Sequence, residues 1–432
     1  MFEHIKGKMS QVQQVAILGY LIKWLLLSLL VGLLAGAASA FFLKSLHWAT
    51  DFRNAHMMIV FGLPIGGLAI GLMYYYWGEG VVKGNNLLLE EFHSPKKIIQ
   101  LRMAPLVLIG TVITHLFGGS AGREGTAVQM GGAIADQFTK WLKLDKRDRR
   151  ILLSCGVAAG FASVFGTPLA GAIFALEVFT IGRMRYDTIV PSVLAAVFAD
   201  YGCRLFNVHH THYEIFSVPS FEVQNFLWVV LAGVFCGLAG MLFSKGVHFW
   251  GDLFKKINYP PLRPVVGGVV LALVIWGMNF DTKYIGLGVP TIVDSFSQQM
   301  NWYDFLVKIL FTTFTLGAGF KGGEVTPLFF VGATLGSALS FWIPLPISLL
   351  AGVCFVAVFS GATNTPIACT MMGIELFGAE AAVYIAIACV IAYLFSGHSS
   401  IYSAQIVGSP KHWSYEDEKG KTLSQIDAEK KN

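Results

Sequence analysis

The 432-residue chain is 55% hydrophobic and only 13% charged, with a formal net charge of +5. A water-soluble chain of this length would carry far more charge, and so modest a positive excess argues against nucleic acid as a partner. Runs of about 18 or more apolar residues recur along the chain, which predicts an all-α protein that crosses the membrane several times.

In chain order, a polar N-terminal segment (1–14) precedes a first membrane half (15–206), a loop (207–221), a second half (222–408) and a polar tail (409–432), which we expect to be disordered. In the first half the spacing predicts helical segments near 15–48, 57–77, 87–92, 98–117, 126–142, 151–165, 168–181 and 187–206. In the second it predicts them near 222–250, 262–279, 303–318, 327–343, 346–360, 366–378 and 380–396.

Several of these segments are too short to span a bilayer and are interrupted by glycine, proline and threonine. Non-helical backbone at membrane depth persists only where protein covers it or where it lines a watery cavity. Interrupted segments at matching places in two halves indicate the binding site of a transporter.

An internal repeat is visible in two pairs of motifs. Gly122–Thr126 reads G-R-E-G-T and Gly322–Thr326 reads G-G-E-V-T, so Glu124 and Glu324 lie 200 positions apart. Two Thr-Pro pairs, at Pro168 and Pro366, lie 198 positions apart. A glutamate follows each proline by nine positions, at Glu177 and Glu375. The spacing alone leaves open whether the two repeats are parallel or inverted.

The glycine-rich turns at 122–126 and 322–327 each open a helix. Free backbone N–H groups and the positive end of the helix dipole make such a turn an anion site. The ionised carboxylate of Glu124 or Glu324 is itself an anion and can occupy that site, whereas the protonated form leaves it, which predicts coupled anion and proton occupancy. The alternative is that these carboxylates only stabilise their helices, and we favour that structural role for Glu177 and Glu375.

The stretch Gly122–Gly132 resembles the G-R-E-G-x-x-V-Q signature of the CLC chloride channels and transporters, and residues 174–177 and the Thr-Pro segments fit the same family. The resemblance covers about 15–408. It implies an inverted repeat of helical segments, many of them short or re-entrant, and a homodimer with one pore per subunit. It also implies that Glu124 is a gating glutamate and that the hydroxyl of Tyr402 faces the central anion.

The sequence departs from the usual CLC pattern at three positions, and at these positions it resembles the fluoride-exporting CLC-F branch of bacteria. Asn85 stands where a serine is usual, Glu324 stands where an apolar residue is usual, and Thr126 replaces a proline. The resemblance implies a fluoride/proton antiporter of the cell (inner) membrane, not an enzyme, with Glu324 as a second proton-transferring carboxylate. It places fluoride among these residues: Asn85, Gly125, Val325, Thr326 and Tyr402.

Other interpretations remain. The chain could instead be a CLC chloride/proton antiporter or a passive chloride channel. The presence of Glu324 counts against both functions. The run Gly118–Gly122 fits the G-x-S-x-G pattern of a serine hydrolase, with His115 nearby, but that pattern requires a strand before the serine. We expect His209, His210 and His212 to be solvated rather than metal ligands, the six cysteines to be reduced and buried, and no cofactor or metal to be needed.

Overall fold

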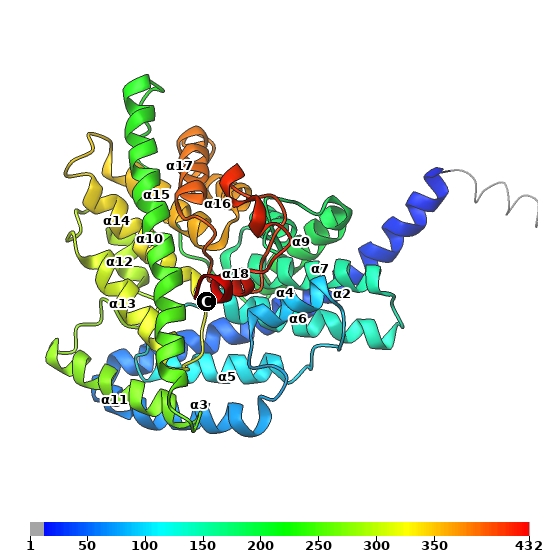
Figure 1. The fold of residues 1–432 in the computed structure, drawn as a ribbon, viewed down its shortest axis with the longest axis horizontal. Helices are drawn as coiled ribbons and strands as arrows, with labels where there is room; N and C mark the ends of the chain where they lie inside the picture. Colours follow the sequence, from blue (N-terminus) through cyan, green and yellow to red (C-terminus); the bar gives the residue numbers. More distant parts are fainter. Residues whose placement is uncertain (1–12, 432) are drawn as a thin grey trace, which may run out of the picture.

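The computed structural model describes residues 13–431, so the predicted polar segment 1–14 lies almost wholly outside the described residues. Within them the chain is helical apart from one pair of two-residue strands (Figure 1). The first half contains α2 (Gln13–Ala55), η1 (Met57–Gly62), α3 (Leu63–Trp77), α4 (Asn85–His93), α5 (Met103–Leu116), α6 (Glu124–Trp141), α7 (Lys146–Phe165), α8 (Pro168–Glu177), β1 (Thr180–Ile181), η2 (Tyr186–Thr188) and α9 (Ile189–Arg204).

The second half repeats this order of long and short helices. It contains α10 (Val223–Lys255), α11 (Leu262–Gly277), α12 (Val289–Asp294), α13 (Asp304–Gly317), α14 (Val325–Leu339), α15 (Ile347–Thr363), α16 (Pro366–Phe377), α17 (Ala382–Phe395), β2 (Ile406–Val407), η3 (Trp413–Glu418) and α18 (Leu423–Lys431). The predicted helical segments are all present, and the short helix α12 is an addition that the sequence did not predict.

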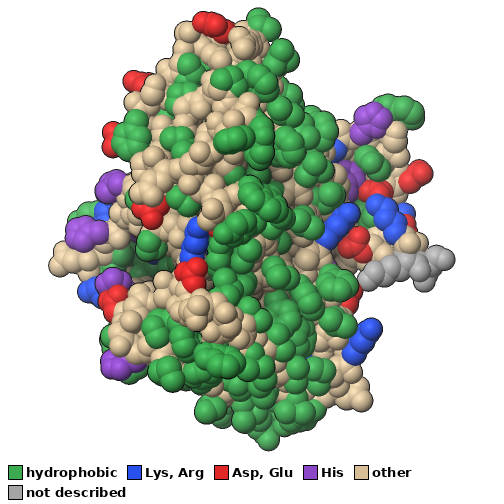
Figure 2. All heavy atoms as spheres, turned by 90° about the vertical axis from the view of Figure 1, so that its left-hand side faces the viewer, with side chains coloured by type: hydrophobic (Ala, Val, Ile, Leu, Met, Phe, Trp, Pro, Cys, Tyr) green, Lys and Arg blue, Asp and Glu red, His purple; other side chains and the backbone are tan. Residues whose placement is uncertain are grey.

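The helices fall into two lengths. Within residues 13–431, three regions are long and apolar enough to cross a membrane alone: Ile17–Ala55, Met57–Trp77 and Val223–Lys255. Many of the remaining helices are apolar but have only 10–17 residues. Figure 2 shows hydrophobic side chains gathered in a broad band on one face, with most charged side chains toward its margins. This is the surface that a multi-pass membrane protein presents to lipid.

The structure decides the relation between the repeats. The carboxylate of Glu177, at the end of α8, accepts hydrogen bonds from the N–H groups of Ile367 (3.2 Å) and Ala368 (2.9 Å) at the start of α16. Conversely, Glu375 near the end of α16 accepts from Leu169 (2.9 Å) and Ala170 (2.7 Å) at the start of α8.

Each of these short helices therefore caps the other, and corresponding residues make corresponding contacts. Such reciprocity is what a two-fold axis between the halves produces. Because the end of one helix meets the start of the other, α8 and α16 run antiparallel and the axis is perpendicular to them. The repeat is inverted.

We predict that Glu375→Gln lowers stability without changing anion selectivity. The amide oxygen can still accept a hydrogen bond, but the negative charge at the α8 N-terminus is lost, which costs about 1–2 kcal/mol in a partly buried site. A melting temperature in detergent about 1–3 °C lower is expected. The control is Glu380→Gln, since Glu380 is exposed just beyond α16. Equal melting temperatures for the two variants would contradict the capping role.

The start of α7 differs from the prediction. The sequence placed an apolar segment at 151–165, after a basic stretch, but α7 begins at Lys146. The Asp145 side chain accepts from the N–H of Asp148 (2.7 Å) and caps the helix. Arg149 is buried and forms ion pairs with Asp136 (2.7 Å) and Glu91 (3.0 Å), which compensate for the cost of burying its charge.

The expectation of a disordered tail is wrong. β2 pairs in parallel with β1, and Leu423 and Ile426 of α18 pack with Ile181 and Val407. Burial raises the pKa of Glu418, but its hydrogen bonds with Lys430 and His398 outweigh burial and hold that pKa below its usual range. A few buried apolar side chains and these ion pairs order a segment whose composition is polar.

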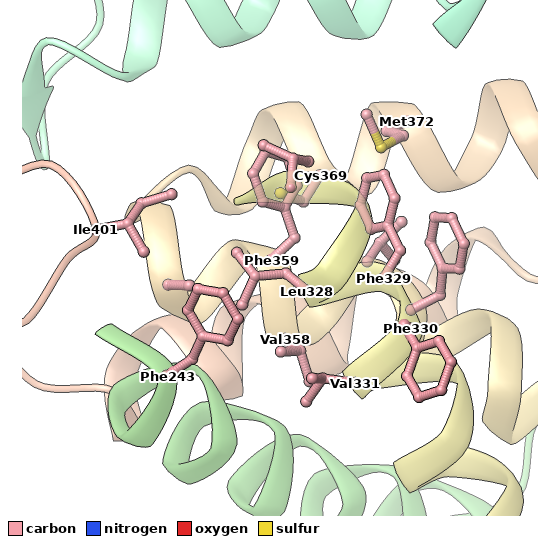
Figure 3. Close-up of a cluster of buried hydrophobic side chains, with 14 of the residues drawn as sticks. Phe243, Leu328, Phe329, Phe330, Val331, Val358, Phe359, Cys369, Met372 and Ile401 are labelled. Carbon is pink, nitrogen blue, oxygen red and sulfur yellow. The ribbon is translucent and has the colours of Figure 1, made fainter. Parts of the chain in front are cut away.

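The helices that carry the two G-x-E-x-T motifs are held by tight packing. A Cβ on Gly131 of α6 would lie 2.2 Å from the carbonyl oxygen of Gly156 in α7, and one on Gly332 of α14 would lie 2.2 Å from that of Cys354 in α15. Only glycine allows these backbones to approach so closely. Figure 3 shows the apolar side of α14, with Phe329 and Phe330 among side chains of α10, α15 and α16. The starts of α6 and α14 are therefore fixed in space.

Candidate functional site

The two G-x-E-x-T motifs meet. Gly122 and Gly323 form an isolated antiparallel bridge, with the Gly122 N–H donating to the Gly323 carbonyl (2.6 Å) and the Gly323 N–H donating to the Gly122 carbonyl (2.8 Å). Segments that are 200 positions apart in the chain thus become direct neighbours. The bridge brings the N-termini of α6 and α14 together.

Glu124 is the first residue of α6 and is fully buried. Its carboxylate accepts hydrogen bonds from the N–H (2.9 Å) and the hydroxyl (2.5 Å) of Thr326, the second residue of α14. Arg123 also donates to it, from its N–H (3.2 Å) and its Nε (3.4 Å). The carboxylate of the first repeat therefore occupies the anion-binding end of a helix in the second repeat.

Glu324 and Asn85 approach Gly125 from the same face. A Cβ on Gly125 would be 2.9 Å from the amide nitrogen of Asn85 and 3.2 Å from Oε2 of Glu324. Both side chains also carry a buried oxygen, Oδ1 of Asn85 and Oε2 of Glu324, that has no hydrogen-bond partner within residues 13–431. Both oxygens are acceptors, and a buried acceptor without a donor is costly, which favours a proton on the Glu324 carboxyl.

Three of the predicted site residues also line one small cavity of about 160 Å³. Asn85, Glu324 and Tyr402 line it together, and the other polar side chains of its wall include Gln129, Lys321 and Lys83. Tyr402 is also within electrostatic reach of both Glu324 and Glu124. Glu124 does not line this cavity; its carboxylate is bound to Thr326 at the start of α14.

A second cavity of about 470 Å³ lies beyond Arg123. Basic and polar side chains line it, including Arg53, Arg123, His47 and His209, with Asp51 as the acid. It shares none of its lining residues with the smaller cavity. Arg123 donates to the Glu124 carboxylate and lines this second cavity, so that carboxylate lies next to the cavity wall.

The structure brings most of the predicted fluoride-site residues together, but not the side chain of Val325. Asn85, Gly125, Glu324 and Tyr402 come together as described, and Thr326 joins them through Glu124. The Val325 side chain is buried in the main apolar core, so at this position only the backbone is left to face an anion. Cys203 and the five other cysteines are free and buried, as predicted.

The serine hydrolase interpretation is wrong. Ser120 is paired with the Thr312 hydroxyl (2.8 Å), not with His115. Both ring nitrogens of His115 face backbone carbonyls, at Thr111 (2.9 Å) and Ala121 (3.0 Å). A nucleophilic serine needs a base within hydrogen-bond reach, and this serine has none among the residues described.

Sequence reasoning missed Lys321. It precedes the second G-x-E-x-T motif directly and lies on the wall of the smaller cavity. The signal was available, because an ionisable residue between two apolar segments of a membrane protein is a functional candidate by default.

The family model for voltage gated chloride channels matches residues 66–397. The chain belongs to this family, the CLC proteins. A chloride/fluoride channel protein of Pseudomonas syringae pv. tomato is 53% identical over 412 residues, covering 94% of this chain and 91% of that protein.

Solved CLC structures have the same fold. A crystal structure of a CLC-type fluoride/proton antiporter covers 89% of this chain and 98% of its own, with 36% identity and a TM-score of 0.86. A slow cyanobacterial Cl⁻/H⁺ antiporter covers 94% and 97%, with 19% identity and a TM-score of 0.75, a likeness of fold alone. The chain is a multi-pass CLC membrane protein and not an enzyme.

Proposed function

We propose that this protein exports fluoride in exchange for protons. The observation that carries the proposal is the placement of two carboxylates at one pair of helix N-termini, Glu124 at the start of α14 and Glu324 beside Gly125 at the start of α6. The family relatives named above, a chloride/fluoride channel protein and a fluoride/proton antiporter, support fluoride as the substrate.

The chemistry of the cavity suits fluoride. Fluoride is small and strongly hydrated and accepts stronger hydrogen bonds than chloride, so it requires strong donors in place of water. The amide of Asn85, the hydroxyl of Tyr402 and the N–H groups at the start of α14 are such donors. A protonated Glu324 is a further donor, since its Oε2 has no protein partner among the described residues.

Proton coupling follows because the Glu124 carboxylate and fluoride compete for the same donors at the start of α14. While Glu124 is ionised, its carboxylate holds the Thr326 N–H and hydroxyl that an anion would use. Protonation removes its charge and weakens these hydrogen bonds, because charge-assisted bonds are roughly twice as strong as neutral ones. The side chain can then leave with its proton, and fluoride can take its place at α14.

The proposal includes a homodimer with one pore per subunit, as in the CLC family. Glu124, Glu324, Asn85, Thr326 and Tyr402 all belong to one chain, so a single subunit has a complete site. A mixed dimer carrying one inactive subunit should therefore keep about half of its transport activity.

The test is anion efflux from liposomes that contain the purified protein. Fluoride should leave at least about ten times faster than chloride, since the strong donors favour the better acceptor by at least one hydrogen bond. Chloride efflux at an equal or greater rate would reject the fluoride proposal and favour a chloride antiporter or channel.

A further inference from the structure

Lys321 has an unusual environment for a lysine. It immediately precedes Gly322 and Gly323, and its backbone N–H donates to the Thr114 hydroxyl (3.2 Å). The stem of the side chain fits against α5 because Gly110 has no Cβ there; a Cβ would lie 2.9 Å from that of Lys321. Both contacts fix the direction in which the lysine leaves the backbone.

The charged end of Lys321 is not neutralised by a direct partner. Its ammonium lies 4.2 Å from the centre of the Tyr74 ring, which attracts cations through its π face. It makes no hydrogen bond or ion pair with any residue in the range 13–431, although Glu324 is close enough to interact electrostatically. An unpaired cation at membrane depth is costly unless it serves an anion.

Lys321 and Tyr74 stand between two cavities. Both line the 160 Å³ cavity of Asn85, Glu324 and Tyr402. Both also line a separate cavity of about 430 Å³, whose wall includes Arg263 and the exposed residues Tyr75 and Glu79. The larger cavity therefore reaches the surface, and Lys321 and Tyr74 belong to the wall that it shares with the cavity of the candidate site.

The smaller cavity needs such a charge. Its other charged side chains are Glu324 and Lys83, and Lys83 is already paired with Glu90 (2.7 Å). An ionised Glu324 would repel an arriving anion at short range, and only an unpaired cation close by offsets that repulsion.

We propose that Lys321 draws fluoride from the 430 Å³ cavity into the site of Asn85, Glu324 and Tyr402, as a substrate-binding residue of the pathway. This inference rests on the proposed function. The anion meets the ammonium first and passes it to the amide, hydroxyl and helix N-terminus beyond, while Tyr74 holds the ammonium at the boundary.

The test measures fluoride efflux from liposomes at a series of internal fluoride concentrations. Lys321→Met should raise the half-saturating fluoride concentration about tenfold, with a smaller change in the maximal rate, because a nearby charge contributes about one decade of affinity. Lys321→Arg, which keeps the charge, should stay within about threefold of the wild type. Lys256→Met removes an exposed lysine that lines neither cavity and should leave the half-saturating concentration unchanged.

The outcomes separate the two claims. A wild-type protein that does not transport fluoride would reject the proposed function. A wild-type protein that transports fluoride, together with a Lys321→Met variant of unchanged half-saturation, would reject only the role of Lys321. A loss in maximal rate alone, or an equal loss in Lys321→Arg, would make the residue structural. Melting temperatures in detergent identify any variant that fails to fold.

Discussion

Replacing Glu124 or Glu324 by glutamine should reduce proton-coupled exchange about 100-fold, the range in which a positioned proton-transfer group contributes. Glutamine has nearly the shape of glutamate but takes up no proton near neutral pH. In Glu124→Gln the amide NH₂ would also face donors, because Thr326 and Arg123 both donate to this side chain. In Glu324→Gln the acid that can donate a proton to fluoride is lost.

The measurement is proton movement across liposomes with a pH electrode while fluoride flows down its gradient. Glu214→Gln is the matched control, since this carboxylate is exposed in the loop between the repeats. It should behave as the wild type does. If either Glu124→Gln or Glu324→Gln still drives protons uphill at the wild-type rate, the role assigned to that residue is wrong.

The second large effect is expected from Asn85→Ser. The serine hydroxyl offers one donor where the amide offers two, and its shorter side chain enlarges the cavity beside Gly125, which favours the larger chloride ion. Losing one hydrogen bond to the anion lowers the fluoride-to-chloride rate ratio about tenfold.

Both anions are measured in the same liposome preparation, so that protein content cancels in the ratio. Asn225→Ser serves as the control, because Asn225 lies on the exposed start of α10, where it donates to the Ser220 carbonyl (3.0 Å). A ratio for Asn85→Ser equal to that of the wild type would mean that another residue discriminates between the anions.

The periodicity and the motif pairs predicted most of the fold. The short apolar segments, the two halves and the glycine-rich helix starts are local features of sequence, and the structure contains them. The relation between the halves was not local. The motif spacing left it open, and the contacts that join Glu177 to α16 and Glu375 to α8 show that these two short helices run antiparallel.

The errors at the ends of elements have the same cause. A polar tail reads as disordered until β1 and the apolar residues of α18 are known to meet. Likewise, the basic start of α7 reads as a loop until the partners of Arg149, Asp136 and Glu91, are known to lie beside it. Composition describes what a segment would do alone, and tertiary partners change that outcome.

For the site, the sequence predicted which residues matter but not how they pair. That Glu124 reaches across to Thr326, rather than staying on its own helix, follows from the bridge between Gly122 and Gly323. Lys321 was overlooked because no motif includes it, although its charge between apolar segments marked it. The functional roles of these residues stay predictions.

The central claim is exchange of fluoride for protons, and the pH inside liposomes tests it most directly. Wild-type protein is placed in liposomes with high internal fluoride, equal pH on both sides and the voltage held at zero. The proposal predicts that fluoride efflux drives protons inward and acidifies the interior against the proton gradient it creates. Fluoride efflux with no acidification of the interior would contradict it.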